Sequence, residues 1–450
     1  MLTRRALAGL AAAGALTPVA ARAIASPSRR AEVAALRAFA EQTHPRGREA
    51  AGDPVWRAAW DRLAGSADSL GDGGYFGGLR SALAWFRDGH TTLLPFAYVG
   101  GPPPAFASGA YGRALPWRVQ VFHDGLFVTE ARDEAAPLLG ARVTEVDGMM
   151  VPDILQRQAK DWPGSAAWAH RWAAGLFDSE GGLGEVGLGA GDVVAVAAEA
   201  PGGGKIAAVL RPRAGAGEGR AGLQRIPTPR EGWAAEAKTA NSVHVLAESG
   251  AIYVALDEMA DVEGKTFAGL TREVFAALER PEARRIVIDL RRNGGGDNFL
   301  GEGLRKGIER SRFNHPGGLY VLTGPRTFSA AQNLANRLER ETFALFVGEP
   351  TGGSPNHYGD GKILQGPVTG VTALVSSLPW FDSYPSDKRP WIAPDLPVPS
   401  LFADWKAGRD PALELALTHR AEGPGDDLSL VRVFYFNRPG QQAPWTPFWR

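Results

Sequence analysis

The spacing of apolar residues predicts helices in the first part of the chain. Apolar positions recur there every three to four residues, which is the period of one helix face. The predicted helices cover residues 31–42, 55–63 and 76–86. Asp53 and Pro54 precede the second helix as a favourable cap and first helical residue. Gly89 follows the third helix and is expected to end it, so the sequence predicts a helical N-terminal domain over residues 27–95.

Between residues 112 and 160 the pattern changes to the two-residue alternation of strands. Residues 117–122 and 125–130 alternate and are separated by a His-Asp-Gly turn, which predicts a hairpin. The segment 136–149 then places another strand before an Asp-Gly turn at Asp147. This arrangement resembles the core of a PDZ-type module, so the fold expected for residues 112–160 is PDZ-like and α+β.

Residues 161–242 are rich in Gly and Ala and give weaker signals. A predicted helix contains three tryptophans, Trp162, Trp168 and Trp172. Residues 193–196 and 206–210 are expected to pair as a hairpin across a Pro-Gly-Gly-Gly-Lys turn. The segment as a whole is interpreted as an irregular lid or linker.

From residue 243 onward strands and helices alternate along the chain. The predicted strands cover residues 252–256, 285–290, 319–323 and 344–348, and the predicted helices cover 265–278 and 329–340. The strand at 285–290 is apolar without alternation, as in a fully buried strand. This pattern predicts a layered α/β domain over residues 243–400 and a C-terminal extension over 401–450.

Composition limits the classes of function. Hydrophobic residues make up 44% of the chain and charged residues 22%, as in ordinary globular proteins. The 49 basic residues balance the 49 acidic residues, and no Lys/Arg-rich run favours nucleic acid as a partner. The absence of cysteine excludes disulfides, thiolate catalysis and cysteine-ligated zinc.

The N-terminus predicts export. Residues 1–23 combine a charged start, a short apolar stretch and small residues at Ala21 and Ala23, the two positions that a signal peptidase recognises. The apolar stretch is shorter than the roughly 20 residues that span a bilayer. The Arg4-Arg5 pair resembles a twin-arginine signal, which proteins that fold before export use. The predicted location is therefore periplasmic or secreted, with no membrane span.

Two segments of the α/β domain carry residues suited to acyl transfer. The first ends in Gly294, Gly295 and Gly296, whose N–H groups can face outward and bind a developing oxyanion. The second places Ser329 where a strand turns into a helix, and the partial positive charge of a helix N-terminus favours an alkoxide. The N–H of Ala330 is expected to join the oxyanion hole. Taken alone, Ser329 is better explained as an ordinary helix cap, because Ser is a preferred residue there.

A third segment, residues 346–353, is a strand followed by the tight loop Gly-Glu-Pro-Thr-Gly-Gly. In this order, Asp-Leu-Arg-x-Asn-Gly-Gly-Gly, Thr-Phe-Ser-Ala-Ala and Val-Gly-Glu-Pro-Thr-Gly-Gly resemble the catalytic core of the C-terminal-processing (tail-specific) serine peptidases. That family includes tricorn-type proteases and the modules of interphotoreceptor retinoid-binding protein. The resemblance covers residues 245–400 closely, and it implies a crotonase-like α/β spiral with Ser329 as the nucleophile.

The general base is where the chain departs from part of this family. Members with a Ser-Lys dyad have Lys in the loop after Gly-Glu-Pro-Thr, but the next lysine here is Lys362, 33 residues beyond Ser329 (362 − 329). Tricorn-like members use a His from the N-terminal region, and Asp-Gly-His-Thr ending at Thr91 resembles their motif. His90 is therefore the predicted base, because a serine hydroxyl needs one and imidazole ordinarily titrates near neutrality. His357 is the alternative.

The resemblance also implies an orienting carboxylate. Asp387 stands 58 residues beyond Ser329 (387 − 329), at the position that the family's carboxylate occupies before the closing Pro-Asp. Asp382 is the alternative, and a solvated loop aspartate is the other interpretation of Asp387.

These residues predict an exported serine peptidase that hydrolyses peptide bonds with Ser329, His90 and Asp387 through an acyl-enzyme. No metal or organic cofactor is implied. The expected partner is a peptide or protein substrate, whose C-terminus the PDZ-like segment would bind as an added strand. Two alternatives stay open: a non-catalytic ligand-binding protein on the same fold, and an esterase or amidase of small substrates.

Overall fold

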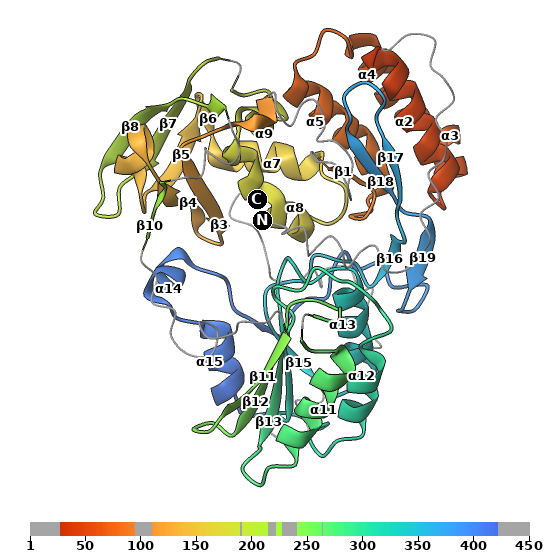
Figure 1. Ribbon diagram of the computed structural model, residues 1–450, viewed down its shortest axis with the longest axis vertical. Coiled ribbons are helices and arrows are strands. Elements are labelled where there is room, and N and C mark those ends of the chain that lie inside the picture. The colour runs from red at the N-terminus through yellow and green to blue at the C-terminus, as the bar shows by residue number, and fades with distance from the viewer. Residues whose placement is uncertain are drawn as a thin grey trace. The chain divides into compact units, whose positions relative to one another are not determined.

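The computed structural model describes residues 28–94, 110–189, 191–214, 222–226, 241–262 and 264–421 (Figure 1). The chain divides into two compact units. Within the described residues, unit 1 contains 241–357 and 380–421, and unit 2 contains 28–226 and 358–379. The leader predicted over residues 1–23 lies outside the described residues. Among the described helices, none combines the length and apolar character that a membrane crossing requires.

Unit 2 begins with the predicted helices. They are α2 (Arg29–Thr43), α3 (Gly47–Gly52), α4 (Pro54–Ser66) and α5 (Asp72–Leu83). The cap of α4 is confirmed, since Asp53 accepts a hydrogen bond from the N–H of Val55 at 2.6 Å. The predicted end at Gly89 is wrong. After α5 the chain continues as the 3-10 turn η1 (Ala84–Phe86) and stops at Arg87, which adopts the left-handed conformation with φ of 50°.

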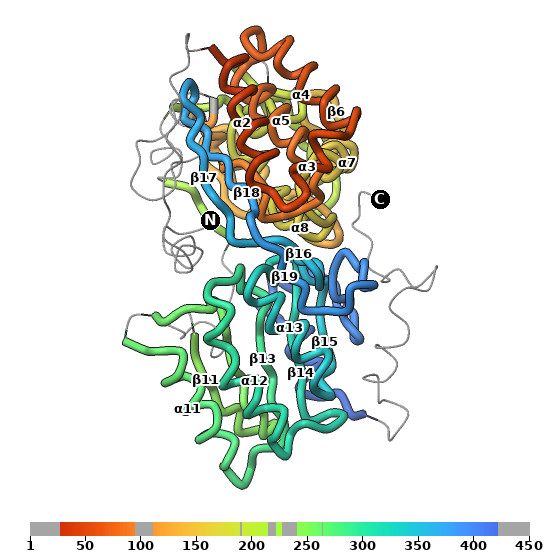
Figure 2. Tube along the Cα trace, turned by 90° about the vertical axis from the view of Figure 1, so that its right-hand side faces the viewer, coloured from red at the N-terminus to blue at the C-terminus, as the bar shows by residue number. Residues whose placement is uncertain are grey.

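A strand pair from the second half of the chain completes this helical part. Strands β17 (Lys362–Gln365) and β18 (Thr372–Val375) form an antiparallel sheet with β1 (Thr92–Leu94), in the order β1-β18-β17. Val371, Ala373 and Val375 are buried in the same core as the apolar faces of α2, α4 and α5, and β17 and β18 run beside α2 in Figure 2. The chain therefore leaves unit 1 and returns to it within the segment where the sequence predicted one continuous α/β domain.

The second part of unit 2 is an antiparallel sheet. Its main strands are β3 (Trp117–Phe122), β4 (Gly125–Ala131), β5 (Arg142–Val146), β6 (Met149–Met150), β7 (Val194–Glu199), β8 (Lys205–Leu210) and β10 (Gln224–Arg225), in the order β10-β4-β5-β7-β8 with β3 beside β4 and β6 beside β5. Both predicted hairpins, β3–β4 and β7–β8, are confirmed. The β7–β8 hairpin, predicted to lie in a lid, continues the sheet of residues 112–160 by pairing with β5. A smaller sheet pairs β2 (Arg113–Ala114) with β9 (Arg213–Ala214).

Short helices pack on this sheet. They are η3 (Asp133–Leu138), α7 (Val151–Lys160), α8 (Ala166–Ala173), η4 (Ala174–Asp178) and α9 (Glu180–Gly184), while η2 (Ala110–Gly112) packs against α9 and α5. Trp168 and Trp172 lie in α8 as predicted, but Trp162 lies in the turn before it. Ser165 caps α8 by accepting from the N–H of Trp168 at 3.1 Å, so the helix cannot begin earlier.

Unit 1 is the predicted layered α/β domain. Its sheet contains β11 (Asn241–Leu246), β12 (Ala251–Leu256), β13 (Arg285–Asp289), β14 (Leu319–Thr323), β15 (Leu345–Gly348) and β20 (Leu396–Pro397), in that order, with β12 to β20 parallel and β11 antiparallel to β12. A two-stranded sheet of β16 (Asn356–Gly359) and β19 (Leu378–Phe381) forms where the chain passes between the units.

Helices cover both faces of the unit 1 sheet. Helices α11 (Phe267–Leu278), α12 (Glu302–Glu309) and α13 (Ala330–Glu341) share one core with alternate strand residues such as Ile286 and Ile288. Helix α15 (Pro411–Thr418), which follows α14 (Phe402–Ala407), packs on the other face with Val287. Because both faces are covered, the strands are apolar without alternation. The predicted C-terminal extension thus supplies one layer of the domain.

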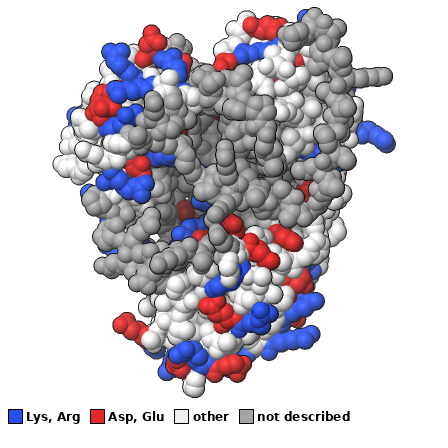
Figure 3. Space-filling view, in the orientation of Figure 1, with Lys and Arg blue, Asp and Glu red and all other residues white. Residues whose placement is uncertain are grey.

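Surface charge agrees with the balanced composition. On the described part of the face in Figure 3, acidic and basic side chains are interspersed, without a broad area of one sign. The totals of acidic and basic residues are also equal, 49 of each. This balance gives no electrostatic signal for a highly charged partner.

Candidate active site

The three predicted motifs meet in unit 1. Because β13, β14 and β15 are parallel, the loops that follow them lie at the same edge of the sheet. The N–H of Phe328 donates to the carbonyl oxygen of Asn293 at 3.2 Å, which joins the serine turn to the glycine turn. The N–H of Gly352 donates to the carbonyl oxygen of Thr327 at 3.0 Å, which joins the third motif to the serine turn. The sequence motifs therefore form one connected site.

Ser329 does not behave as an ordinary helix cap. Its backbone has φ of 56° and ψ of −127°, and its side chain makes no capping hydrogen bond to α13. An ordinary cap adopts extended dihedral angles and accepts from the first turn. A non-glycine residue in this region is strained by about 1–3 kcal/mol, and such strain persists where the surroundings enforce it. A sharp, strained turn between a strand and a helix is how many hydrolases present a serine nucleophile.

The glycine turn leaves room for the serine. Gly295 has φ of 110°, and a Cβ atom there would lie 2.5 Å from the Cβ atom of Ser329 and 3.1 Å from the nitrogen of Ala330. Gly296 has φ of 138°, and its Cβ would lie 2.2 Å from the carbonyl oxygen of Met259. Glycine is therefore required at both positions, and the space it leaves is bordered by Ser329 and the Ala330 nitrogen.

The donors of this turn are not equivalent. The N–H of Gly295 donates to Oδ1 of Asn293 at 2.9 Å, and Nδ2 of Asn293 donates to the carbonyl oxygen of Leu256 at 2.9 Å. Asn293 thus anchors the turn to the end of β12. Gly295 contributes open space beside Ser329, and its N–H is already bound in this structure.

The charged residues of the first motif have a structural role. Buried Asp289 accepts from Nη2 of Arg291 at 2.6 Å and from the hydroxyl of Tyr253 at 2.5 Å, and Arg291 also donates to Asp410 at 2.7 Å. Burial acts to raise the pKa of Asp289, but the guanidinium of Arg291 outweighs it and holds that pKa below its ordinary value. This cluster fixes the end of β13, from which the glycine turn starts.

Asp387 lies in a buried hydrogen-bonded cluster of unit 1. Its Oδ2 accepts from the hydroxyl of Ser383 at 2.7 Å and from Nη2 of Arg389 at 2.9 Å. Arg389 also donates to both carboxylate oxygens of Glu339 on α13, at 2.8 and 2.9 Å. Burial acts to raise the pKa of Asp387, but Arg389 outweighs it and lowers that pKa below its usual range. Asp387 is therefore an ionised, buried carboxylate and not a solvated loop residue.

The other candidates from the sequence lie in different surroundings. Asp382 has Oδ2 3.6 Å from Nε of Arg337, and its side chain is partly exposed. His357 lies in β16 with Nδ1 3.1 Å from the carbonyl oxygen of Ser354. Lys362 is an exposed residue of β17 in unit 2.

His90 is buried in unit 2, in the loop between η1 and β1. Its ring nitrogen Nδ1 lies 3.8 Å from Oδ1 of Asp88, and the main-chain N–H of His90 donates to the same oxygen at 3.1 Å. The side chain of Asp88 also accepts from the hydroxyls of Thr91 at 2.7 Å and Ser376 at 2.6 Å. In the sequence Asp88 was only part of the histidine motif, and no pattern identified it as a buried carboxylate facing the ring of His90.

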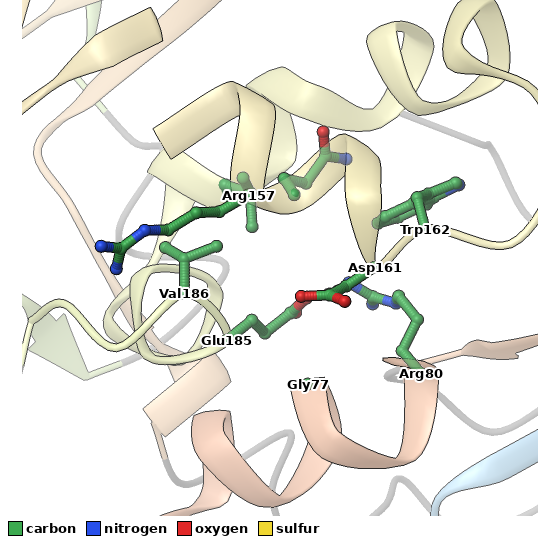
Figure 4. A pocket seen from close by; sticks show the side chains of 9 residues that line it. Gly77, Arg80, Arg157, Asp161, Trp162, Glu185 and Val186 are labelled. Atoms are coloured by element: carbon green, nitrogen blue, oxygen red, sulfur yellow. The ribbon is translucent and has the colours of Figure 1, made fainter. Parts of the chain in front are cut away.

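Unit 2 also contains a pocket of about 240 Å³, and none of the predicted catalytic or oxyanion-hole residues lines it (Figure 4). Arg80 lines it between the rings of Phe76 and Trp162, at 4.6 and 4.2 Å, and pairs with Glu185. Burial lowers the pKa of Arg80 to about 10. Asp161 and Arg157 also line the pocket, so acidic and basic groups balance there and single out no charged ligand. Within the described residues, no group of three or more acidic, His or Cys side chains is placed to hold a metal ion.

Solved structures with a similar fold include CPAF. The chain matches mature CPAF with a TM-score of 0.56 and 13% identity, covering 87% of this chain and 96% of that one. It matches CPAF complexed with lactacystin at 0.52 and 14%, covering 90% and 98%. The photosystem II D1 C-terminal processing protease is a weaker match, at 0.39 and 15%, covering 83% and 94%. No family model matches the chain. The chain thus has the α/β fold of CPAF, and the resemblance to the C-terminal-processing peptidases is confirmed at the level of the fold.

Proposed function

We propose that this protein is an exported serine peptidase in which Ser329 is the nucleophile. The observation that carries the proposal is the strained backbone of Ser329 beside a turn that only glycine can form. An ordinary structural serine would gain nothing from that strain, whereas a nucleophile gains an Oγ held next to N–H donors. The likeness of fold to CPAF supports the same conclusion.

In this mechanism Oγ of Ser329 attacks the scissile carbonyl carbon while the imidazole of His90 takes the hydroxyl proton. The N–H groups of Ala330, Gly294 and Gly296 stabilise the oxyanion of the tetrahedral intermediate, and Gly295, whose N–H is bound to Asn293, leaves the space for it. His90 then gives its proton to the leaving amine. Water, deprotonated by His90, hydrolyses the acyl-enzyme and restores Ser329. Asp387 is proposed as the orienting carboxylate, and its low pKa keeps it ionised at neutral pH.

The finer architecture is part of the proposal. We assign unit 1 to the crotonase-like α/β spiral and the antiparallel sheet of unit 2 to a PDZ-like module. The Asp147-Gly148 turn after β5 supports the second assignment, because both residues adopt the positive φ of a tight hairpin. The PDZ-like module would bind the C-terminus of a peptide or protein substrate by strand addition.

A serine-directed fluorophosphonate probe tests the nucleophile. The wild-type protein should become labelled, Ser329→Ala should not, and Ser311→Ala should be labelled like the wild type because it removes a hydroxyl from the turn after α12. Equal labelling of Ser329→Ala would refute the assignment. A wild-type protein that neither becomes labelled nor hydrolyses a peptide library would instead be the non-catalytic binder, and hydrolysis of esters alone would make it an esterase.

Export is proposed to follow the twin-arginine route, from the Arg4-Arg5 pair. Replacing both arginines by lysine should leave the precursor in the cytoplasm, because that pair is the address the translocase reads. Cell fractionation with antibody detection would measure it. Normal processing of the double variant would show that another route exports the protein.

A further inference from the structure

The carboxylate of Asp88 is held in a fixed position inside unit 2. The residue is only 4% exposed. The main-chain N–H of His90 donates to Oδ1, while the hydroxyls of Thr91 and Ser376 donate to Oδ2. Thr91 Oγ1 also accepts from the N–H of Ser376 at 3.1 Å, so the loop is bound to the end of β18. These contacts restrain both oxygens and the loop that carries His90.

A second histidine lies against the same carboxylate. Nδ1 of His44 accepts a hydrogen bond from the N–H of Arg46 at 3.0 Å, so the proton of neutral His44 is on Nε2. That Nε2 lies 3.6 Å from Oδ2 of Asp88, and the ring stacks on Phe86 at 3.9 Å. Oδ2 therefore faces two hydroxyls and an imidazole N–H, and Oδ1 is the oxygen that faces His90.

We propose that Asp88, in place of Asp387, is the positioning residue that holds the proton of the His90 imidazole on Nδ1 and thereby leaves Nε2 to accept the proton of Ser329. The proposal rests on His90 being the general base of the proposed function. Its geometric basis is the 3.8 Å separation between Nδ1 of His90 and Oδ1 of Asp88. An ionised carboxylate at this distance favours the tautomer with the proton on the facing ring nitrogen, and it stabilises the imidazolium that forms when the other nitrogen takes a proton.

Asp88 remains ionised in this environment. Burial acts to raise its pKa, but the His44 and His90 imidazoles and the Ser376 hydroxyl outweigh burial and hold the pKa well below its ordinary value. Other titratable groups on the surrounding elements are Tyr358, whose ring lies 4.7 Å from that of His44, and Arg46, which pairs with Glu49 at 2.8 Å.

Asp387 differs in that a guanidinium already balances its charge. Arg389 donates to both of its oxygens and also binds Glu339. The charge of Asp387 is therefore partly compensated inside unit 1, whereas Asp88 has no guanidinium or ammonium partner among the ion pairs of the described residues. Exchanging each aspartate for asparagine compares the two carboxylates at nearly constant shape.

Nitrogen NMR of histidine-labelled protein tests the proposal without requiring activity. The experiment uses the full chain in the Ser329→Ala background, and His90 is assigned by the signal that disappears in His90→Gln. The neutral ring of His90 should be protonated on Nδ1. In Asp88→Asn its titration midpoint should fall by about 1 to 3 pH units, because the imidazolium loses its nearby negative charge. Ser376→Ala, which keeps that charge, should move the midpoint much less.

Three results would overturn the proposal. They are an Nε2-protonated ring in the parent protein, an unchanged midpoint in folded Asp88→Asn, and a larger fall in Asp387→Asn than in Asp88→Asn. If Asp88→Asn does not fold, the tautomer of the parent protein decides. In active protein the acid limb of the kcat/KM profile should move to lower pH in Asp88→Asn, as the NMR midpoint does. Full activity of Ser329→Ala would refute the proposed function and leave the NMR result on Asp88 standing.

Discussion

Exchanging single glycines for alanine in the turn beside Ser329 should separate two adjacent residues that look alike in the sequence. Gly295 has φ of 110°, and an added Cβ would lie 2.5 Å from the Cβ atom of Ser329. At Gly294 an added Cβ would meet no atom within 4 Å, and its backbone is not left-handed. Gly295→Ala should therefore be strongly harmful, and Gly294→Ala is its matched control.

The size of the effect follows from this geometry. A left-handed backbone costs a residue with a side chain about 1–2 kcal/mol. Two carbons pack best at about 3.5–4.0 Å, so a contact of 2.5 Å requires the turn and Ser329 to move apart by about 1 Å. Forced overpacking of this kind costs about 1–3 kcal/mol. Gly295→Ala should therefore lower the free energy of unfolding by about 2–5 kcal/mol, and Gly294→Ala should change it by less than about 0.5 kcal/mol.

Activity should fall as well, because the added methyl group also occupies the space beside the Ala330 nitrogen. A displacement of about 1 Å at a reacting group costs about 100-fold in rate. Urea denaturation would measure the stability, and fluorophosphonate labelling at equal folded fraction would measure the reactivity of Ser329. If Gly295→Ala is as stable and as readily labelled as Gly294→Ala, then the turn does not pack against the serine and the oxyanion-hole proposal fails.

Three further predictions concern the proposed triad. Ser329→Gly should raise the free energy of unfolding by about 1 kcal/mol while abolishing labelling, since glycine relieves the positive φ; a destabilised variant in urea denaturation would contradict the strain. His90→Ala should reduce peptide hydrolysis as much as Ser329→Ala and Lys362→Ala should be nearly silent, because triad members act as a unit; the reverse pattern would identify lysine as the base. Asp387→Asn should reduce turnover more than Asp382→Asn. In Asp387→Asn the free energy of unfolding should also decrease less steeply as the pH is lowered. The folded-state pKa of Asp387 is lowered, so its contribution is present above the unfolded value of about 3.9 and is lost as pH falls below it; equal urea midpoints for wild type and variant from pH 5 to 3 would refute this.

Local patterns in the sequence determined most of unit 1. Strands such as β13 were identified from uninterrupted apolar residues. Helices cover both faces of the sheet, so neither face of the strand contacts solvent and polar residues do not alternate with apolar ones. The order of the glycine, serine and Gly-Glu-Pro-Thr-Gly-Gly motifs resembled the catalytic core of a peptidase family and so implied one site. In the structure, parallel strands bring the loops that follow them to the same edge. These signals depend on residues close together along the chain.

Conformation at single residues needed the structure. Ser329 has the residue type and position of a helix cap, and only its φ of 56° distinguishes a strained turn from a cap. Likewise, Gly89 was the natural end of the third helix, but the chain turns at Arg87 instead. In both cases tertiary packing imposes a conformation against the intrinsic preference of the residue, which no pattern of residue types records.

Long-range contacts were decided by tertiary structure alone. The motif ending at Thr91 predicted a functional histidine, but the hydroxyl of Ser376 that holds Asp88 lies 288 residues away in the sequence. The strand that precedes this serine, β18, belongs to unit 2, although the surrounding sequence predicts a single α/β domain. The pairing of this carboxylate with this hydroxyl depends on how β1 aligns with β18, whose residues Ala373 and Val375 are buried in the helical core. No periodic pattern in the sequence links two residues that are so far apart.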